Sequence, residues 1–187
     1  IRATASSWIE MVNSDGDVIT SKLLRAGESI AANLDDKLYL TAKITVVGLP
    51  DKPGIAAKIF GVLADLHINV DMIVQSASAD LQKTDITFSL ARIDLEKAVS
   101  DLTILKDELV FERLVHDNNI AKISVIGTAM RTQSGIAKRM FEVLSEKQIN
   151  MQVISTSEIK ISVLIQADYT ELAVRSLHDA FELEKIG

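Results

Sequence analysis

Apolar and polar positions follow the same order twice along the chain. In the first half, a β-branched run ends at Gly48 and is followed by a stretch with apolar residues every three or four positions. β-branched runs are typical of buried strands, and the three-to-four spacing is typical of one face of a helix. The same succession recurs in the second half, starting with the run that ends at Gly127. The pattern therefore predicts two copies of one domain.

Direct alignment of the two halves supports a duplication. Two blocks repeat with an offset of 81 positions: GIAAKIFGVL at 54–63 matches GIAKRMFEVL at 135–144, and INV at 68–70 matches INM at 149–151. A later block, Ala98-Val99, matches Ala173-Val174 with an offset of 75, so the second copy is six residues shorter between these blocks. The repeated blocks therefore indicate that the chain contains a duplicated domain.

Each copy is expected to contain strands and helices in the order β-α-β-β-α. The first copy adds a fourth strand, which gives the ferredoxin-like βαββαβ unit, an α+β fold with an antiparallel sheet and two helices on one face. The strands are expected at 42–48, 68–75, 84–90 and about 109–115, and then at 121–127, 149–156 and 158–165. The helices are expected to begin at Gly54, Asp94, Gly135 and Asp168.

These elements divide the chain into an N-terminal segment, 1–41, and two domains, 42–117 and 118–187. Only six residues follow the last helix, so a further strand for the second copy must come from elsewhere. We expect the stretch between Val18 and Leu40 to cross over and supply it. The chain begins with Ile rather than Met, and we expect it to be a fragment or a protein lacking its start.

Composition excludes several classes of protein. The 187 residues include no cysteine, which excludes disulfides, zinc–thiolate sites and a cysteine nucleophile. The net charge is −6 without a basic cluster, so nucleic-acid binding is not expected. No apolar run approaches 18 residues, so a membrane span is not expected either. The three histidines lie far apart without metal-ligand spacing, and no catalytic motif occurs. We therefore expect a cytoplasmic protein with no catalytic site and no metal site in this chain.

The loop Leu49–Gly54 carries the most informative candidate chemistry. It leads from a buried strand to the start of a helix, where free backbone amides favour an anion such as a carboxylate. Asp51 beside that helix start is suited to an ammonium group. The loop thus fits a free amino acid, and it equally fits a plain strand-to-helix turn in which Gly54 only permits close packing.

Four sequence strings carry a resemblance to a known family. They are PDKPG at 50–54, MIVQ at 72–75, TDITF at 84–88 and ISTSEIKIS at 154–162. Together with the duplication, they resemble the paired ACT domains in the C-terminal regulatory region, or the separate regulatory β subunit, of aspartate kinase. The resemblance covers about residues 42–183, and ISTSEIKIS is its most specific part.

The resemblance implies a regulatory function. In this family the paired ACT domains sense lysine and/or threonine and inhibit the ATP-dependent phosphorylation of aspartate to 4-phosphoaspartate. The chain would then be part of a phosphotransferase without holding its catalytic site. ATP and magnesium would belong to the absent kinase domain, so no cofactor is expected in this chain. Implied partners are that kinase domain or catalytic subunit and a second copy of the chain, in a homodimer formed through the ACT domains.

The resemblance also implies a set of effector-binding residues. In the first copy these residues are Asp51, Gly54, Ile55, Ala56, Asn69, Val70, Asp71 and Gln75. In the second copy they are Ile136, Ala137, Asn150, Met151 and Ser157, with Ser155 to Glu158 nearby. The second loop, 128–134, departs from the pattern because it is two residues longer and has no Asp matching Asp51. The second site is therefore expected either to differ in specificity or to be an interface.

A second hypothesis from a different class stays open. The chain would then be an ACT-type regulatory or dimerisation module of another enzyme of amino-acid metabolism. The string ISTSEIKIS and the duplication favour aspartate kinase, and titration with amino acids discriminates the two hypotheses.

Overall fold

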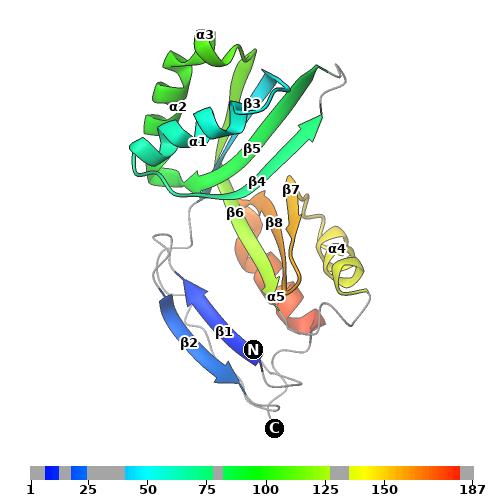
Figure 1. Ribbon diagram of the computed structural model, residues 1–187. Coiled ribbons are helices and arrows are strands. Elements are labelled where there is room, and N and C mark those ends of the chain that lie inside the picture. Colours follow the sequence, from blue (N-terminus) through cyan, green and yellow to red (C-terminus); the bar gives the residue numbers. More distant parts are fainter. Residues whose placement is uncertain (1–6, 13–17, 25–40, 78–81, 127–134, 182–187) are drawn as a thin grey trace. The chain divides into compact units, whose positions relative to one another are not determined.

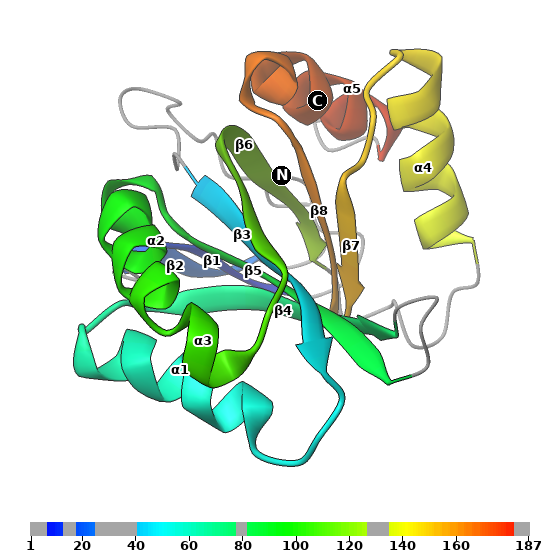
Figure 2. The same cartoon turned by 90° about the horizontal axis from the view of Figure 1, so that it is seen from above.

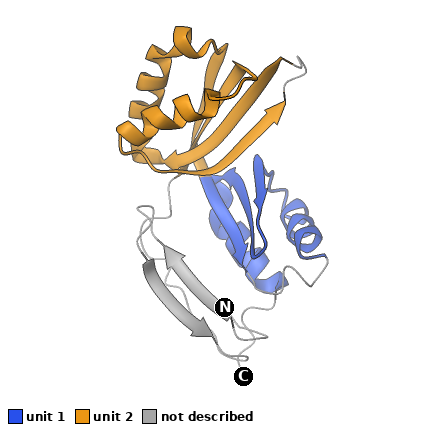
Figure 3. Ribbon diagram, in the orientation of Figure 1, with its two compact units in different colours: residues 1–39, 121–187 blue, residues 40–120 orange. Residues whose placement is uncertain are grey.

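The computed structural model describes residues 7–12, 18–24, 41–77, 82–126 and 135–181. The chain divides into two compact units, one formed by residues 40–120 and the other by residues 1–39 and 121–187 (Figure 3). Both units have the mixed α/β architecture that the sequence pattern predicts, with antiparallel strands and helices on one side of each sheet (Figures 1 and 2).

The unit of residues 40–120 contains a four-stranded antiparallel sheet in the order β4-β5-β3-β6. Its elements are β3 (Thr41–Pro50), α1 (Ile55–Asp65), β4 (Val70–Ala77), β5 (Lys83–Ala91), the 3-10 turn η1 (Arg92–Asp94), α2 (Leu95–Ile104), α3 (Lys106–Leu109) and the first part of β6 (Arg113–Ile126). This order agrees with the expected βαββαβ pattern, with a short helix added before the last strand.

Helices α1 and α2 cover one face of this sheet (Figure 1). Alternate residues of β5 point into the core, and Phe88 is fully buried there. The ring of Phe60 on α1 meets the ring of Phe88 edge-on, with 5.5 Å between ring centroids. Aromatic pairs favour this arrangement because the positive edge of one ring faces the negative face of the other. This contact therefore packs helix α1 against strand β5.

The C-terminal part of the other unit, residues 121–187, repeats the architecture with strands in the order β6-β8-β7. Its elements are the end of β6, α4 (Ile136–Glu146), β7 (Val153–Thr156), β8 (Lys160–Gln166), the 3-10 turn η3 (Ala167–Tyr169) and α5 (Thr170–Ala180). Met140 and Leu144 on α4 are fully buried in a core shared with Val163 of β8. Asp94 is the N-cap of α2, as expected, although its side chain makes no capping hydrogen bond. In contrast, α5 begins at Thr170, and Asp168 lies inside the preceding turn η3.

The strand β6 differs from the expectation of two separate strands at 109–115 and 121–127. Residues 106–109 form α3, and one strand then runs without a break from Arg113 to Ile126. Arg113 pairs with Val47 of β3, and the later part of the same strand neighbours β8. The polar residues at 116–119 resemble a turn in the sequence, but a strand with exposed positions accepts polar side chains.

The N-terminal segment also differs from the expectation in its described part. Strand β2 (Val18–Leu24) pairs with β1 (Ser7–Val12) in a separate two-stranded antiparallel sheet, and not with β6, β7 or β8. Only five residues separate β1 from β2, so pairing between them costs little loop-closure entropy compared with pairing to a distant strand. Residues 25–40 lie outside the described residues, so the crossover stays a prediction for them.

Across the part of the chain that the structure describes, none of the helices is both long and apolar enough to cross a membrane.

Candidate functional site

The loop between β3 and α1 is anchored to the start of β5. The register of the β3–β5 ladder shifts between Val46 and Leu49, and Gly48 at this shift has a φ of +74°. Its amide donates a 2.8 Å hydrogen bond to Oδ1 of Asp85, and the amide of Asp51 donates a 2.9 Å bond to the carbonyl of Gln82. The sequence analysis did not identify this anchor, although Asp85 lies within the TDITF string.

The loop ends at a helix start whose first amides are free of intrahelical partners. Gly54 caps α1 with a φ of +91°, and no side chain bonds to the cap. The first amide with an i→i−4 bond is that of Lys58, which donates to the Gly54 carbonyl at 3.1 Å. The amides of Ala56 and Ala57 at this exposed helix start are therefore available to an anion, as the first amides of a helix generally are.

The sheet register brings Gln75 to the same end of the sheet as this loop. Strands β3 and β4 both run antiparallel to β5, so they are parallel to each other. Both therefore finish at the end of the sheet where β5 begins (Figure 1). Gln75 lies opposite Ile86, near the start of β5, and its side chain is exposed. Exposed Asp51, the start of α1 and Gln75 thus form one group of expected effector residues.

Three other expected residues lie at the opposite end of β4. Asn69 and Asp71 are exposed and Val70 is half-buried, and Val70 pairs with Leu90 near the end of β5. Oδ1 of Asp71 accepts the amide of Met72 at 2.8 Å. The structure therefore separates the residues of the first copy into two groups rather than bringing all of them into one pocket.

In the second unit, the start of α4 has the same geometry as the start of α1. Gly135 caps α4 with a φ of +96°, and the amide of Arg139 donates to the Gly135 carbonyl at 2.9 Å. Ile136 and Ala137 follow this cap and are half-buried. The loop with no counterpart of Asp51, residues 128–134, lies outside the described residues.

The remaining residues expected in the second site flank β7. Asn150 is exposed and Met151 half-buried just before the strand, and Ser157 lies in the turn after it. The amide of Ser157 donates to the carbonyl of Lys160 at 2.7 Å, which closes the turn between β7 and β8. These residues are therefore also divided between the two ends of their strand.

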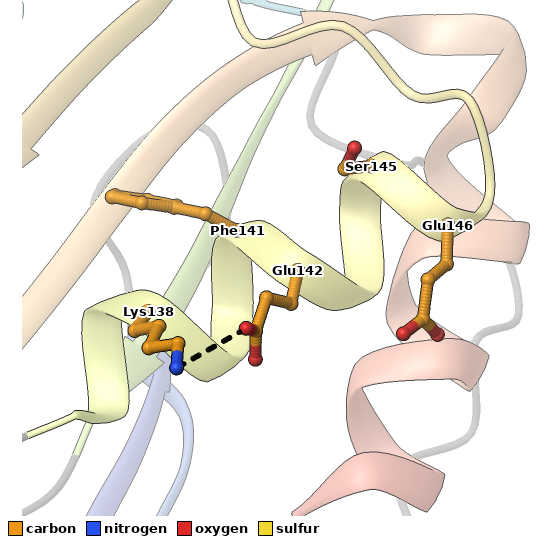
Figure 4. A pocket seen from close by; sticks show the side chains of 5 residues that line it. All are labelled: Lys138, Phe141, Glu142, Ser145 and Glu146. Carbon is orange, nitrogen blue, oxygen red and sulfur yellow. Dashed lines mark ion pairs between the residues drawn. The ribbon is translucent and has the colours of Figure 1, made fainter.

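An open hollow lies elsewhere, along one exposed face of α4 (Figure 4). It is lined by side chains of this single helix, namely Lys138, Phe141, Glu142, Ser145 and Glu146. Lys138 and Glu142 form an i,i+4 ion pair at 3.5 Å on its rim. None of the expected effector residues lines it, and exposed i,i+4 pairs are common on helix surfaces. In the described ranges, no group of three or more His, Asp or Glu side chains is arranged to hold a metal ion.

Comparison with family models separates the N-terminal segment from the rest of the chain. Residues 44–103 and 123–181 each match the ACT domain, whereas residues 1–42 match a different family, the RodZ C-terminal domain. The two ACT matches together cover more than half of the chain.

Known proteins similar to this chain are aspartate kinases and their regulatory subunits. The aspartate kinase of Stutzerimonas stutzeri is 47% identical over 155 residues, which are 83% of this chain and 36% of that protein. The chain thus spans about a third of the length of the curated relatives it matches. A solved structure of aspartokinase alpha and beta subunits has 43% identity and a TM-score of 0.71, and the match covers 78% of this chain and 95% of that one. The ligand-free regulatory subunit of aspartate kinase from Thermus thermophilus has 34% identity and a TM-score of 0.70, with coverages of 76% and 93%.

Both the duplicated fold and the family matches therefore place the same residues in two ACT domains. The chain belongs to the ACT-domain family, as a pair of ACT domains of the kind that form the regulatory region of aspartate kinases.

Proposed function

We propose that this chain is the amino-acid-binding regulatory region of an aspartate kinase, which senses lysine and/or threonine and mediates feedback inhibition of ATP-dependent aspartate phosphorylation. The observation that carries the proposal is the group at one end of the first sheet. There the exposed carboxylate of Asp51 lies in the loop that leads to the start of α1, which has no side-chain capping bond, and Gln75 lies near the end of the parallel strand β4.

This group offers complementary partners for both ends of a free amino acid. The amides of Ala56 and Ala57 donate hydrogen bonds to the effector's α-carboxylate, and the helix dipole favours its negative charge. The carboxylate of Asp51 pairs with the α-ammonium group. Gln75 carries both a donor and an acceptor, so it can bond to either a hydroxyl or an ammonium group of the effector side chain.

The phosphotransfer chemistry belongs to a kinase domain or catalytic subunit that acts with this chain in the cytoplasm. ATP and magnesium bind there, and these ACT domains contribute the effector's binding energy. Inhibition requires that the effector bind one conformation of the complete enzyme more tightly than another, since equal affinity for both shifts nothing.

Calorimetric titration tests the proposal directly. We expect lysine or threonine to bind the chain, while leucine, valine and serine serve as comparison ligands. Asp51→Ala should weaken binding roughly thirtyfold or more, because removing one partner of a desolvated charge pair costs about 2–5 kcal/mol. Asp65→Ala is the matched control, since it removes an exposed carboxylate at the far end of the same helix.

The proposal fails if neither lysine nor threonine binds to the folded chain, or if Asp51→Ala binds both as tightly as the parent while its circular dichroism is unchanged. In the complete enzyme, Asp51→Ala should relieve inhibition and leave uninhibited turnover as it was, because the catalytic groups lie in another domain.

We also propose that the chain forms a homodimer through the outer strands of its sheets. Ile73 on β4 and Ile154 on β7 occupy equivalent positions of the two copies and are 50% and 44% exposed. Each lies on a strand at the end of the sheet order, where backbone groups are free to pair with another chain. Light scattering should give about twice the 20.4 kDa mass of one chain.

The variants Ile73→Glu and Ile154→Glu should shift the dimer toward monomer, because a charge at an apolar interface has to be desolvated. Ile93→Glu is the control, since Ile93 lies outside both strands and is 89% exposed. A parent chain that is monomeric at micromolar concentration, with and without effector, contradicts the dimer.

A further inference from the structure

Strand β4 contains one extra residue relative to its partner β5. Asp71 lies opposite Ser89 and Val74 lies opposite Thr87, so three steps along β4 correspond to two steps along β5. Met72, within this bulge, has a φ of +46° and is 7% exposed. A residue other than glycine rarely adopts this left-handed conformation, so other contacts must hold it there.

Two hydrogen bonds hold the bulge. Oδ1 of Asp71 accepts the amide of Met72 at 2.8 Å, which ties the left-handed residue to its neighbour. The hydroxyl of Ser89 donates to the carbonyl of Asp71 at 3.0 Å from the adjacent strand. Ser89 is 1% exposed, so this hydroxyl is a buried polar group whose bond is costly to lose.

The bulge determines which face of β4 carries Gln75. With the extra residue, Gln75 lies opposite Ile86, whose side chain points into the core beneath α1 and α2. Because side chains alternate along a strand, an unbulged β4 would place Gln75 opposite Asp85 and on the other face of the sheet. The residues after the bulge would all exchange faces in the same way.

The second copy lacks the serine hydroxyl of this arrangement. The pairs Gln75 with Ile86 and Thr156 with Ile161 are equivalent, which places Leu164 at the position of Ser89. Leucine has no hydroxyl to donate. Val153, at the position of Met72, is not among the described residues with positive φ, although the amide of Gln152 donates to the carbonyl of Leu164 at 2.8 Å.

We infer that Asp71 and Ser89 are positioning residues for the amino-acid effector: they hold the bulge at Met72 and thereby present Gln75 on the face of β4 that is covered by α1. The role of Gln75 in this inference rests on the proposed function. The register of β4 against β5 can be tested without any ligand.

Engineered cysteine pairs report the register, because the chain has no cysteine of its own. Val74→Cys with Thr87→Cys should form a disulfide in the bulged strand, since these two positions lie directly opposite each other. Ile73→Cys with Thr87→Cys should form one only if the bulge is lost. Both pairs change Thr87, so the effect of that change is common to them.

The two cysteine pairs are then compared in three backgrounds. Asp71→Ala combined with Ser89→Ala should shift cross-linking at least severalfold from position 74 to position 73, whereas Ser89→Thr, which keeps the hydroxyl, should behave like the parent. Thr84→Val is the matched control, because buried Thr84 also donates a 3.0 Å bond from β5 to a β4 carbonyl, that of Ser76. It should leave the cross-linking preference unchanged.

Calorimetry then links the register to the effector. Gln75→Ala should raise the dissociation constant of lysine or threonine roughly fivefold, as the loss of one neutral hydrogen bond does. The double variant Asp71→Ala, Ser89→Ala should raise this dissociation constant at least as much. Adding Gln75→Ala to the double variant should raise the dissociation constant little further. Unchanged cross-linking in that variant overturns the inference, as does a fully additive effect of Gln75→Ala. If the parent binds neither amino acid, the proposed function fails, and the cross-linking still decides the role of Asp71 and Ser89 in the register.

Discussion

The backbone amide of Gly48 donates a 2.8 Å hydrogen bond to Oδ1 of Asp85, across the ladder between β3 and β5. This bond lies where the register of β3 shifts, and the shift places Leu49 in the core just before the loop that carries Asp51. A side chain that stabilises the bulge therefore also determines where the candidate effector loop begins.

Replacing Gly48 should destabilise the protein strongly. A Cβ at this position would lie 2.5 Å from Cγ of Glu112, and the φ of +74° is unfavourable for alanine. We expect Gly48→Ala to lower the free energy of unfolding by about 2 kcal/mol or more, measured by denaturant titration.

The matched control for this prediction is Gly61→Ala. Gly61 lies inside α1, and a Cβ there would have no atom within 4 Å. Because alanine is about 1 kcal/mol better than glycine in a helix interior, Gly61→Ala should raise the free energy of unfolding by up to that amount. Equal effects of the two substitutions would contradict the explanation given for Gly48.

A pair of hydroxyl groups joins neighbouring strands at equivalent places in the two units. Thr45 and Thr87 are 2.9 Å apart between β3 and β5, and Ser124 and Ser162 are 2.7 Å apart between β6 and β8. Ser162→Ala should cost about 1–2 kcal/mol, because it leaves the hydroxyl of Ser124 without this partner.

A double-mutant cycle tests that pair. Ser124→Ala combined with Ser162→Ala should cost less than the sum of the two single substitutions, by about 0.5–1.5 kcal/mol in thermal or denaturant unfolding. Strict additivity would show that the two hydroxyls do not stabilise each other. The equivalent cycle with Thr45→Val and Thr87→Val should give coupling of the same sign.

Val110 is predicted to be a site where glycine stabilises the fold. Val110 follows α3 with a φ of +55°, a left-handed conformation that favours glycine over a β-branched residue. Its side chain is 63% exposed, so removing it loses little buried apolar surface. We expect Val110→Gly to raise the free energy of unfolding by about 0.5–1 kcal/mol. Val115→Gly is the control: Val115 is exposed within strand β6, where glycine should lower stability. A lower melting temperature for Val110→Gly would contradict this prediction.

The parts of the fold that depend on local patterns could be predicted from the sequence. The spacing of apolar residues after Gly54 and Gly135 predicts α1 and α4, and the structure places them at Ile55–Asp65 and Ile136–Glu146. The family resemblance likewise indicated the loop of Asp51. These signals are local, because a helix face or a strand-to-helix turn is specified by residues close together in the chain.

The features that depend on pairing between distant strands could not be predicted in this way. The bulges at Gly48 and Met72 arise from the register with β5, and that register brings Gln75 to the end of the sheet where Asp51 lies while leaving Asn69 at the other end. The sequence of a motif alone does not determine which of its residues lie at one end of a strand and which lie at the other.

The unbroken strand from Arg113 to Ile126 has a consequence for any attempt to divide the protein. Its first residues pair with β3 of one ACT domain, and its last residues neighbour β8 of the other. Tandem domains usually offer a linker for truncation, whereas these two domains are joined by a strand within the described residues. A cut near Ile120 would divide β6, so each ACT domain would keep only the part of this strand that pairs with its own sheet.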